Sequence, residues 1–296
     1  MNLSKSLNGI SRIAHSFFMQ CRMHLPRQRC DTFVPSSGGG RSGIGPIYVI
    51  NLDRQPERWA NMLRELVRIE DGAGNPLSER VVRHSACDAQ VQDQPSEGEF
   101  IEPFYTLGEQ LFVEPQPEAI PDKFELERPI RMSAAEIAIA RSHVDVWEAI
   151  AQSPEAYALV VEDDVLFKRG FSKTLDLAWK EMEEDDRTPA LFDILYLSYK
   201  EARYGAPKEL ISKNVFRPES GLWFLSGYVF SKSGAQALLR HLPCRGPIDL
   251  WINHKFKELC VRAVRQAIIN QRLDTQSTNT YSILPALNRI GVLDSD

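Results

Sequence analysis

The stretch "ALVVEDDVLF" (residues 158–167) joins an apolar run to three consecutive acidic residues. The apolar run predicts a buried strand, and Glu162, Asp163 and Asp164 follow at its end. Neighbouring like charges repel by about 1 kcal/mol per pair at 4 Å in water. Three carboxylates at a strand end therefore indicate either a solvated acidic turn or a divalent cation bound by carboxylate oxygens. Because successive strand residues point to opposite faces, we expect Glu162 and Asp164 to project together, without Asp163.

Strand and helix signals alternate on both sides of this stretch. Strands are predicted at residues 47–52, 78–86, 157–164, 192–198 and 222–230. Helices are predicted at 53–68, 133–154 and 172–184, at a segment capped by Ser233 and Gln236, and from near Pro247 onwards. This alternation predicts an α/β fold with a mostly parallel sheet.

The helix predicted at 133–154 has the clearest boundaries. Ser133 and Glu136 form a capping-box pattern, and Pro154 ends the helix. His143 falls within its apolar arc, where a histidine is more often a hydrogen-bonded core residue than a ligand.

Composition limits the function classes. The chain has 296 residues, is 43% hydrophobic and carries a net charge of −5, which argues against nucleic acid as the main partner. It has no apolar run of 18 residues and no recognisable secretory signal. Five scattered cysteines favour a reducing compartment, so we expect a cytoplasmic protein: Cys21, Cys30, Cys87, Cys244 and Cys260.

Residues 1–45 form a predicted leader and linker. Residues 1–30 are basic, lack acids and carry apolar residues at helical spacing, which is typical of a membrane-surface anchor, a disordered leader or a transit peptide. The anchor would place the protein peripherally on the inner face of a membrane. A flexible Gly-rich segment follows at 35–45, so the folded domain is expected to span 46–296. Within it, the acidic, proline-containing insertion at 92–128 is expected to be a long surface excursion.

A second polar group follows the strand at 47–52. Asn51, Arg54 and Arg58 place an amide and two guanidinium groups where they suit a nucleotide diphosphate, although surface salt bridges are the commoner use of such arginines. No G-x-G-x-x-G and no P-loop pattern is present, so neither a dinucleotide fold nor a P-loop is supported. Acidic strand ends also occur in receiver-domain pockets and phosphohydrolases.

Six segments together resemble glycosyltransferase family 25, which contains lipopolysaccharide β-galactosyltransferases and procollagen galactosyltransferases. They are "IYVINLDRQPERW", "AEIAIARSHVDVW", "ALVVEDDVLF", "FDILYL", "GYVFSKSGAQALL" and "PIDLW". The resemblance covers roughly residues 46–286. It implies the A-type glycosyltransferase fold, a nucleotide-binding α/β/α sandwich, with a nucleotide-sugar donor and inversion at the anomeric carbon.

The resemblance also implies residue roles. It places Asn51, Arg54 and Arg58 in a nucleotide-side motif, Ser142 and His143 in a Ser-His pair, Glu162, Asp163 and Asp164 in an acidic metal motif, and Asp249 at an acid near the C-terminal end. The family's usual Gly-Glu-Ile-Gly-Cys-Ala-Leu-Ser-His differs here at Ala135, Ala138, Ile139 and Arg141.

The expected function is transfer of a hexose, with galactose as the expected sugar, from a UDP-sugar to a hydroxyl of a saccharide or glycoconjugate. The acidic motif would hold Mn²⁺ or Mg²⁺, and Asp249 would accept the acceptor's proton. Asp249 also suits a helix start. Two other classes stay open: a metal-dependent phosphohydrolase acting on nucleotide sugars, and an inactive binding homologue.

Overall fold

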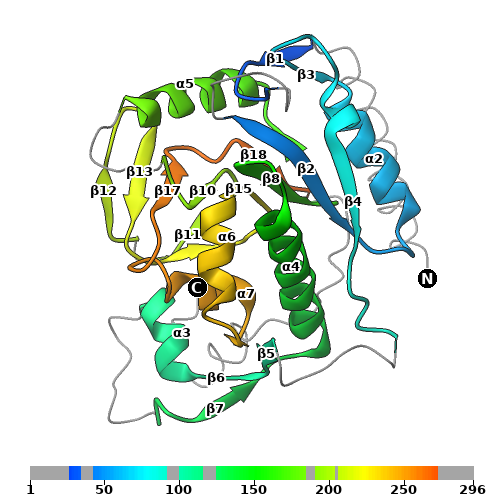
Figure 1. The fold of residues 1–296 in the computed structure, drawn as a ribbon. Helices are drawn as coiled ribbons and strands as arrows, with labels where there is room; N and C mark the ends of the chain where they lie inside the picture. Colours follow the sequence, from blue (N-terminus) through cyan, green and yellow to red (C-terminus); the bar gives the residue numbers. More distant parts are fainter. Residues whose placement is uncertain are drawn as a thin grey trace, which may run out of the picture.

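An eight-stranded sheet forms the centre of the computed structural model, which describes residues 27–34, 43–91, 100–115, 125–184, 191–203 and 206–272 (Figure 1). Its strand order is β12-β13-β17-β10-β15-β8-β2-β4. The strands are β2 (Ile44–Asn51), β4 (Val81–Ser85), β8 (Tyr157–Glu162), β10 (Ile194–Tyr196), β12 (Lys208–Leu210), β13 (Val215–Pro218), β15 (Gly227–Ser231) and β17 (Val261–Val264). Only β13 and β15 run against the other six strands, so the sheet is mostly parallel, as predicted.

Helices cover both faces of this sheet. Alternating residues of β2 divide between two cores: Tyr48 packs on one face and Val49 on the other. The first face is covered by α4 (Ala134–Gln152), α6 (Lys232–Leu239) and α7 (Ile248–Asn253), and the second by α2 (Pro56–Leu66) and α5 (Phe171–Glu183). The fold is therefore the α/β/α sandwich that the family resemblance implied.

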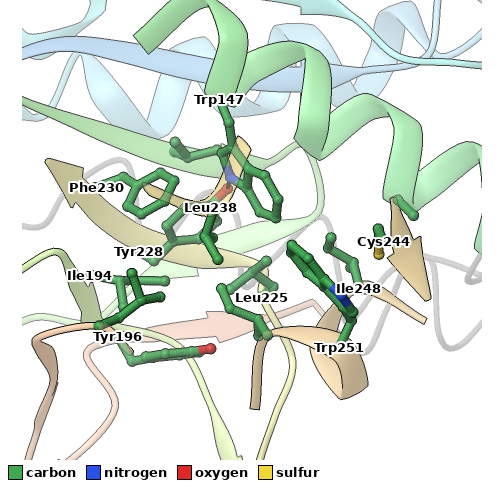
Figure 2. Packing of buried hydrophobic residues seen from close by; sticks show 14 of the residues in the cluster. Trp147, Ile194, Tyr196, Leu225, Tyr228, Phe230, Leu238, Cys244, Ile248 and Trp251 are labelled. Atoms are coloured by element: carbon green, nitrogen blue, oxygen red, sulfur yellow. Dashed lines mark hydrogen bonds between the residues drawn. The ribbon is translucent and has the colours of Figure 1, made fainter. Parts of the chain in front are cut away.

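Aromatic side chains join the helices of the first face to the sheet (Figure 2). Trp147 of α4 stacks on Trp251 of α7, with ring centroids 6.2 Å apart, and meets Phe230 of β15 edge-on. Its indole Nε1 donates a 2.9 Å hydrogen bond to the hydroxyl of Tyr228, which is also in β15. All of these rings are buried, so α4, α7 and β15 are held in one fixed arrangement.

The capping box predicted for α4 is confirmed. Ser133 Oγ accepts the backbone N–H of Glu136, whose carboxylate accepts the N–H of Ser133 at 2.7 Å. The cap predicted for α6 is wrong: Ser231, not Ser233, accepts the N–H of Gly234, because the helix begins at Lys232.

The strand predicted at 222–230 is two strands. β14 (Leu222–Trp223) pairs with β11 (Lys200–Glu201), outside the main sheet, whereas β15 begins only at Gly227. Phe224, between them, has φ = 72°, a left-handed backbone conformation that no extended strand contains.

Folded chain is also present on the N-terminal side of Pro46. β1 (Gln28–Cys30) runs parallel to β3 (Ile69–Asp71), and Phe33 is fully buried in the second core. Residues 1–26 of the predicted leader and 35–42 of the predicted linker lie outside the described residues. None of the helices in the described ranges has the length and apolar character needed to cross a membrane.

The described part of the acidic insertion is not the surface excursion that we expected. It forms β5 (Ile101–Glu102), β6 (Phe104–Thr106) and α3 (Leu107–Val113), followed by β7 (Pro129–Arg131). Ile101, Tyr105 and Val113 are almost fully buried in the first core. The elements are too short to show a hydrophobic period, and the acids between them hide the buried positions. The remaining short elements are η1 (Leu77–Arg80), β9 (Val165–Phe167), β16 (Cys244–Arg245) and β18 (Ile269–Gln271).

Gly234 in α6 is a packing constraint that can be tested. A Cβ atom there would lie 2.8 Å from the Cβ and the carbonyl oxygen of Asp193. We expect Gly234→Ala to lower the free energy of unfolding by about 1–3 kcal/mol, as measured by urea denaturation. Gly108→Ala in α3 is the control, because its Cβ would meet Leu126 O at an ordinary 3.6 Å and alanine favours a helix. Equal stability of the two variants would contradict the close contact.

Candidate functional site

Three strand ends meet at one edge of the sheet. Asn51 is the last residue of β2, Ser85 ends β4 and Glu162 ends β8. The register places Asn51 beside Ser85 and Ile50 beside Glu162. Because these strands are parallel, their carboxyl ends open on the side where α/β sheets bind ligands.

The acidic triplet spans the end of β8 and the turn that follows. Asp163 and Asp164 form the two-residue turn between β8 and β9, so strand alternation does not decide where their side chains point. β9 pairs with β18, and the backbone N–H of Arg272 donates to the carbonyl of Asp164 at 2.6 Å. The side chain of Glu162 is 25% exposed, whereas Asp163 and Asp164 are buried.

Asp163 is held by two of the predicted nucleotide-side residues. Asn51 Nδ2 donates to its Oδ2 at 2.6 Å, and Arg58 Nη1 donates to its Oδ1 at 3.2 Å. The same Arg58 atom lies 3.8 Å from Oδ2 of Asp164. Arg58 reaches both carboxylates because Pro56 starts α2 shortly after β2 ends. The structure therefore brings Asn51, Arg58 and the acidic pair together.

Arg83 belongs to this cluster and was not predicted. Its Nε and Nη2 both donate to Oδ1 of Asn51, at 2.9 and 2.6 Å, which fixes the amide so that Nδ2 faces Asp163. The only sequence feature that could have indicated this role is the position of Arg83, a charged residue inside a predicted strand and two positions before Ser85, where β4 ends.

Arg54 and Ser142 have other partners. Arg54 Nε donates to Asp88 Oδ2 at 2.6 Å in the segment after β4, and its side chain is 36% exposed. Ser142 Oγ donates to the carbonyl of Ala138 and accepts the N–H of Cys87 at 2.9 Å. Ser142 therefore anchors the chain that leaves β4 to α4, and its described contacts are to protein groups.

His143 is buried and connects the aromatic core to the acidic triplet. Its Nδ1 lies 3.0 Å from the Tyr228 hydroxyl, and its Nε2 lies 3.7 Å from Glu162 Oε1. The Tyr228 oxygen accepts the indole N–H of Trp147, which leaves its own proton available to Nδ1 of His143. In the tautomer with Nδ1 as the acceptor, the neutral imidazole carries its one N–H proton on Nε2, on the side of Glu162. No local sequence signal identifies Tyr228, which is 85 residues from His143.

Burial changes the acidity of the two turn carboxylates. It raises the pKa of Asp163 by more than the Asn51 hydrogen bond and the Arg58 charge lower it. Burial, and then the negative charge of Glu162, raise the pKa of Asp164 to about 7. The charge of Arg58, and to a smaller extent a contact from Gln271, offset this rise only in part. Oδ1 of Asp164 is buried without a hydrogen-bond partner among the described residues. A cation at this oxygen would favour the ionised carboxylate and satisfy the unpaired atom.

These carboxylates do not form a complete metal site by themselves. No group of three or more acidic, histidine or cysteine side chains within the described ranges converges in a metal-binding arrangement. The residues fit a cation that takes one or two carboxylates here and its other oxygens from substrate phosphates and water, as Mg²⁺ commonly does. Asp164 and Glu162 suit this role better than Asp163, whose two oxygens already accept hydrogen bonds.

Asp249 lies in the first turn of α7, close to the acidic triplet. Its Oδ2 accepts the N–H of Phe224 at 3.3 Å, and its Oδ1 accepts the N–H of Leu250 at 3.0 Å. The carboxylate is partly exposed at the surface but densely surrounded by protein, and burial raises its pKa, with a further rise from the charge of Glu162. A raised pKa makes Asp249 a stronger proton acceptor than an ordinary carboxylate.

The buried Arg58 charge can be tested by mutation. Arg58→Met should lower the free energy of unfolding by about 3–5 kcal/mol, because it leaves buried carboxylates without their counter-charge. Arg54→Met is the matched control: its partner Asp88 is near the surface, so we expect a loss of about 1 kcal/mol or less. Urea denaturation of both variants measures the difference, and equal losses would contradict the special position of Arg58.

Comparison with known proteins assigns this chain to a family. Residues 44–252, which include every predicted site residue, match the sequence profile of glycosyltransferase family 25 (LPS biosynthesis protein). A glycosyltransferase 25 family member of Aedes aegypti is 24% identical over 229 residues, which are 74% of this chain and 32% of that protein. Procollagen galactosyltransferase 2 of Homo sapiens is 27% identical over 201 residues, 67% of this chain and 28% of that protein.

A third relative is named inactive. The inactive glycosyltransferase 25 family member 3 of Homo sapiens is 25% identical over 249 residues, 81% of this chain and 35% of that protein. The chain thus spans about a third of the length of the curated relatives that it matches. The family profile covers well over half of this chain, and on that ground the protein belongs to glycosyltransferase family 25.

Proposed function

We propose that the chain transfers a hexose from a UDP-sugar to a hydroxyl group of a saccharide or glycoconjugate. The observation that carries this proposal is the buried cluster of Asp163, Asp164, Arg58 and Asn51 at the ligand-binding edge of a family 25 sheet. The name of the procollagen galactosyltransferase relative supports galactose as the sugar.

The nucleotide side is assigned to the residues after β2 and β4. Arg58 and Arg54 offer guanidinium groups to a diphosphate, and Asn51 is held in place for this by Arg83. Ser142 supports the same side by fixing the chain after β4. His143 borders the same acidic motif, with its Nε2 3.7 Å from Glu162 Oε1.

A divalent cation, Mn²⁺ or Mg²⁺, is proposed at Asp164 and Glu162, with Asp163 in support. When bound, such a cation neutralises negative charge that develops on the departing UDP. The chain's own contribution is to hold Asp163 and Asp164 in a region with little water, where the attraction of a carboxylate to a cation is strong.

Asp249 is proposed as the group that accepts the proton of the attacking hydroxyl. Its raised pKa suits this role, and its place near Glu162 puts it beside the proposed donor site. The leader at residues 1–30 is proposed to contact an anionic membrane surface through its basic residues.

One product analysis separates this proposal from its rivals. The protein is incubated with a panel of UDP-sugars and Mn²⁺, with and without saccharide acceptors. Transfer gives UDP and an extended saccharide only when acceptor is present. A phosphohydrolase would release phosphate or nucleoside monophosphate without acceptor, and an inactive homologue, a class that the family contains, would bind no UDP-sugar.

The cation role predicts conditional binding of UDP. We expect UDP to raise the melting temperature in the presence of Mn²⁺ and not in EDTA, because carboxylates without a cation repel the diphosphate. Asp164→Asn should weaken the Mn²⁺-dependent shift, with partial recovery at higher Mn²⁺. Glu70→Gln, which removes a carboxylate paired with Arg27 instead, should leave the shift unchanged. Equal shifts with and without EDTA would refute the cation role.

The proposed role of Asp249 as a base predicts a loss of turnover without a loss of UDP binding. Asp249→Asn preserves the shape of the side chain but cannot accept a proton, so kcat should fall by about 10²-fold or more. UDP binding in the presence of Mn²⁺ should stay close to that of the parent. Transfer assays and UDP titrations measure the two effects separately. If turnover remains near normal, Asp249 serves only the start of α7 and another group accepts the proton.

A further inference from the structure

Phe224 combines two properties that a phenylalanine rarely has together. Its φ is 72°, in the left-handed region that bulky side chains avoid, and its side chain is exposed to solvent (40% accessible). Its neighbour Leu225 is buried, with 4% exposure. An exposed ring in an unfavourable backbone conformation contributes little to the core, so its position calls for another explanation.

The chain on both sides of Phe224 is tightly held. Its own N–H donates to Asp249 Oδ2 at 3.3 Å. On one side, the indole Nε1 of Trp223 donates to the buried carboxylate of Glu114. On the other, the carbonyl of Ser226 accepts the N–H of Glu162 at 3.1 Å. Phe224 therefore lies in a short segment whose ends bond to Glu114 and to the end of β8, and its own N–H bonds to the proposed base.

An exposed phenylalanine whose backbone N–H bonds to a carboxylate suits one class of ligand particularly well. A pyranose ring has an apolar face of C–H groups that packs on an aromatic ring, and hydroxyl groups at its edge that bond to a carboxylate. The nucleotide-side residues Asn51 and Arg58 belong to β2 and α2, and β8 separates β2 from β15 in the sheet. Phe224 lies on the β15 side, together with Asp249.

We propose that Phe224 is a binding platform for the acceptor sugar, which packs its apolar face on the exposed ring and directs its hydroxyl group to Asp249. The proposal rests on the proposed function, because that function supplies the acceptor. The contact between the Phe224 N–H and Asp249 then has a further role: it sets the position of the platform relative to the base.

The variant Phe224→Gly tests whether the ring serves sugar binding or the stability of the fold. Glycine adopts a φ of 72° readily, so this variant removes the ring and also relieves the unfavourable backbone conformation. We expect its melting temperature to equal or exceed that of the parent, and its acceptor KM to rise about tenfold, which is the loss of one good stacking contact. UDP binding with Mn²⁺ should stay unchanged. Phe224→Tyr keeps the ring and should retain the acceptor KM of the parent.

Phe104→Leu is the control for loss of an exposed ring, because Phe104 is equally exposed (39%) but lies in β6. Its acceptor KM should match that of the parent. A parent-like acceptor KM in Phe224→Gly, or a fall in its melting temperature, would overturn the proposal.

A binding measurement makes the test independent of turnover. Saturation-transfer NMR with methyl glycosides of galactose, glucose and N-acetylglucosamine, in the presence of UDP and the diamagnetic Mg²⁺, detects sugar contact directly. Binding by the parent and its loss in Phe224→Gly would support the platform even if no transfer occurred, in which case only the proposed function would fail. Equal sugar binding by both proteins, or none by the parent, would overturn the platform.

Discussion

Two carboxylates buried at the end of β8 are the constraint on which the site depends. Burying a charge costs several kcal/mol unless it is paired and hydrogen-bonded. Asp163 meets that requirement through Asn51 and Arg58, and Asn51 is in turn held by Arg83. These contacts tie β2, β4, α2 and the turn after β8 into one rigid unit. Asp164 differs, because its buried Oδ1 lacks a hydrogen-bond partner among the described residues.

The sequence predicts this arrangement where local patterns decide the structure. The buried strands β2 and β8 follow from continuous apolar runs, and α4 follows from Ser133 and Glu136. Side-chain directions in the acidic triplet do not follow, because strand alternation ends at Glu162 and a turn begins. The partner of His143 also escapes prediction, since Tyr228 comes near it only after β15 has joined β8. Long-range pairing of this kind has no local signal.

Two of the residues that differ from the usual family pattern near the Ser-His pair make specific contacts in the fold. Arg141, which departs from the usual family pattern, bonds to Asp145 at 2.6 Å and lies over the ring of Phe100, 4.3 Å from its centroid. Phe100 belongs to the acidic insertion. Ala138, another changed position, accepts the Ser142 hydroxyl through its carbonyl. At least one of the changed residues of α4 therefore contacts the insertion directly.

The insertion contributes to the site without a core of its own. β5 pairs with β16, shortly before α7, and Glu114 accepts both the Trp223 indole N–H and the backbone N–H of Arg203. If the insertion were transferred to a relative without β16 and Trp223, it would lack the residues against which it folds. Moved together with residues 222–226 and 244–249, it would form a transferable cassette. If Phe224 binds the acceptor sugar as proposed, exchange of that cassette between relatives would change the acceptor preference and leave the proposed nucleotide side intact.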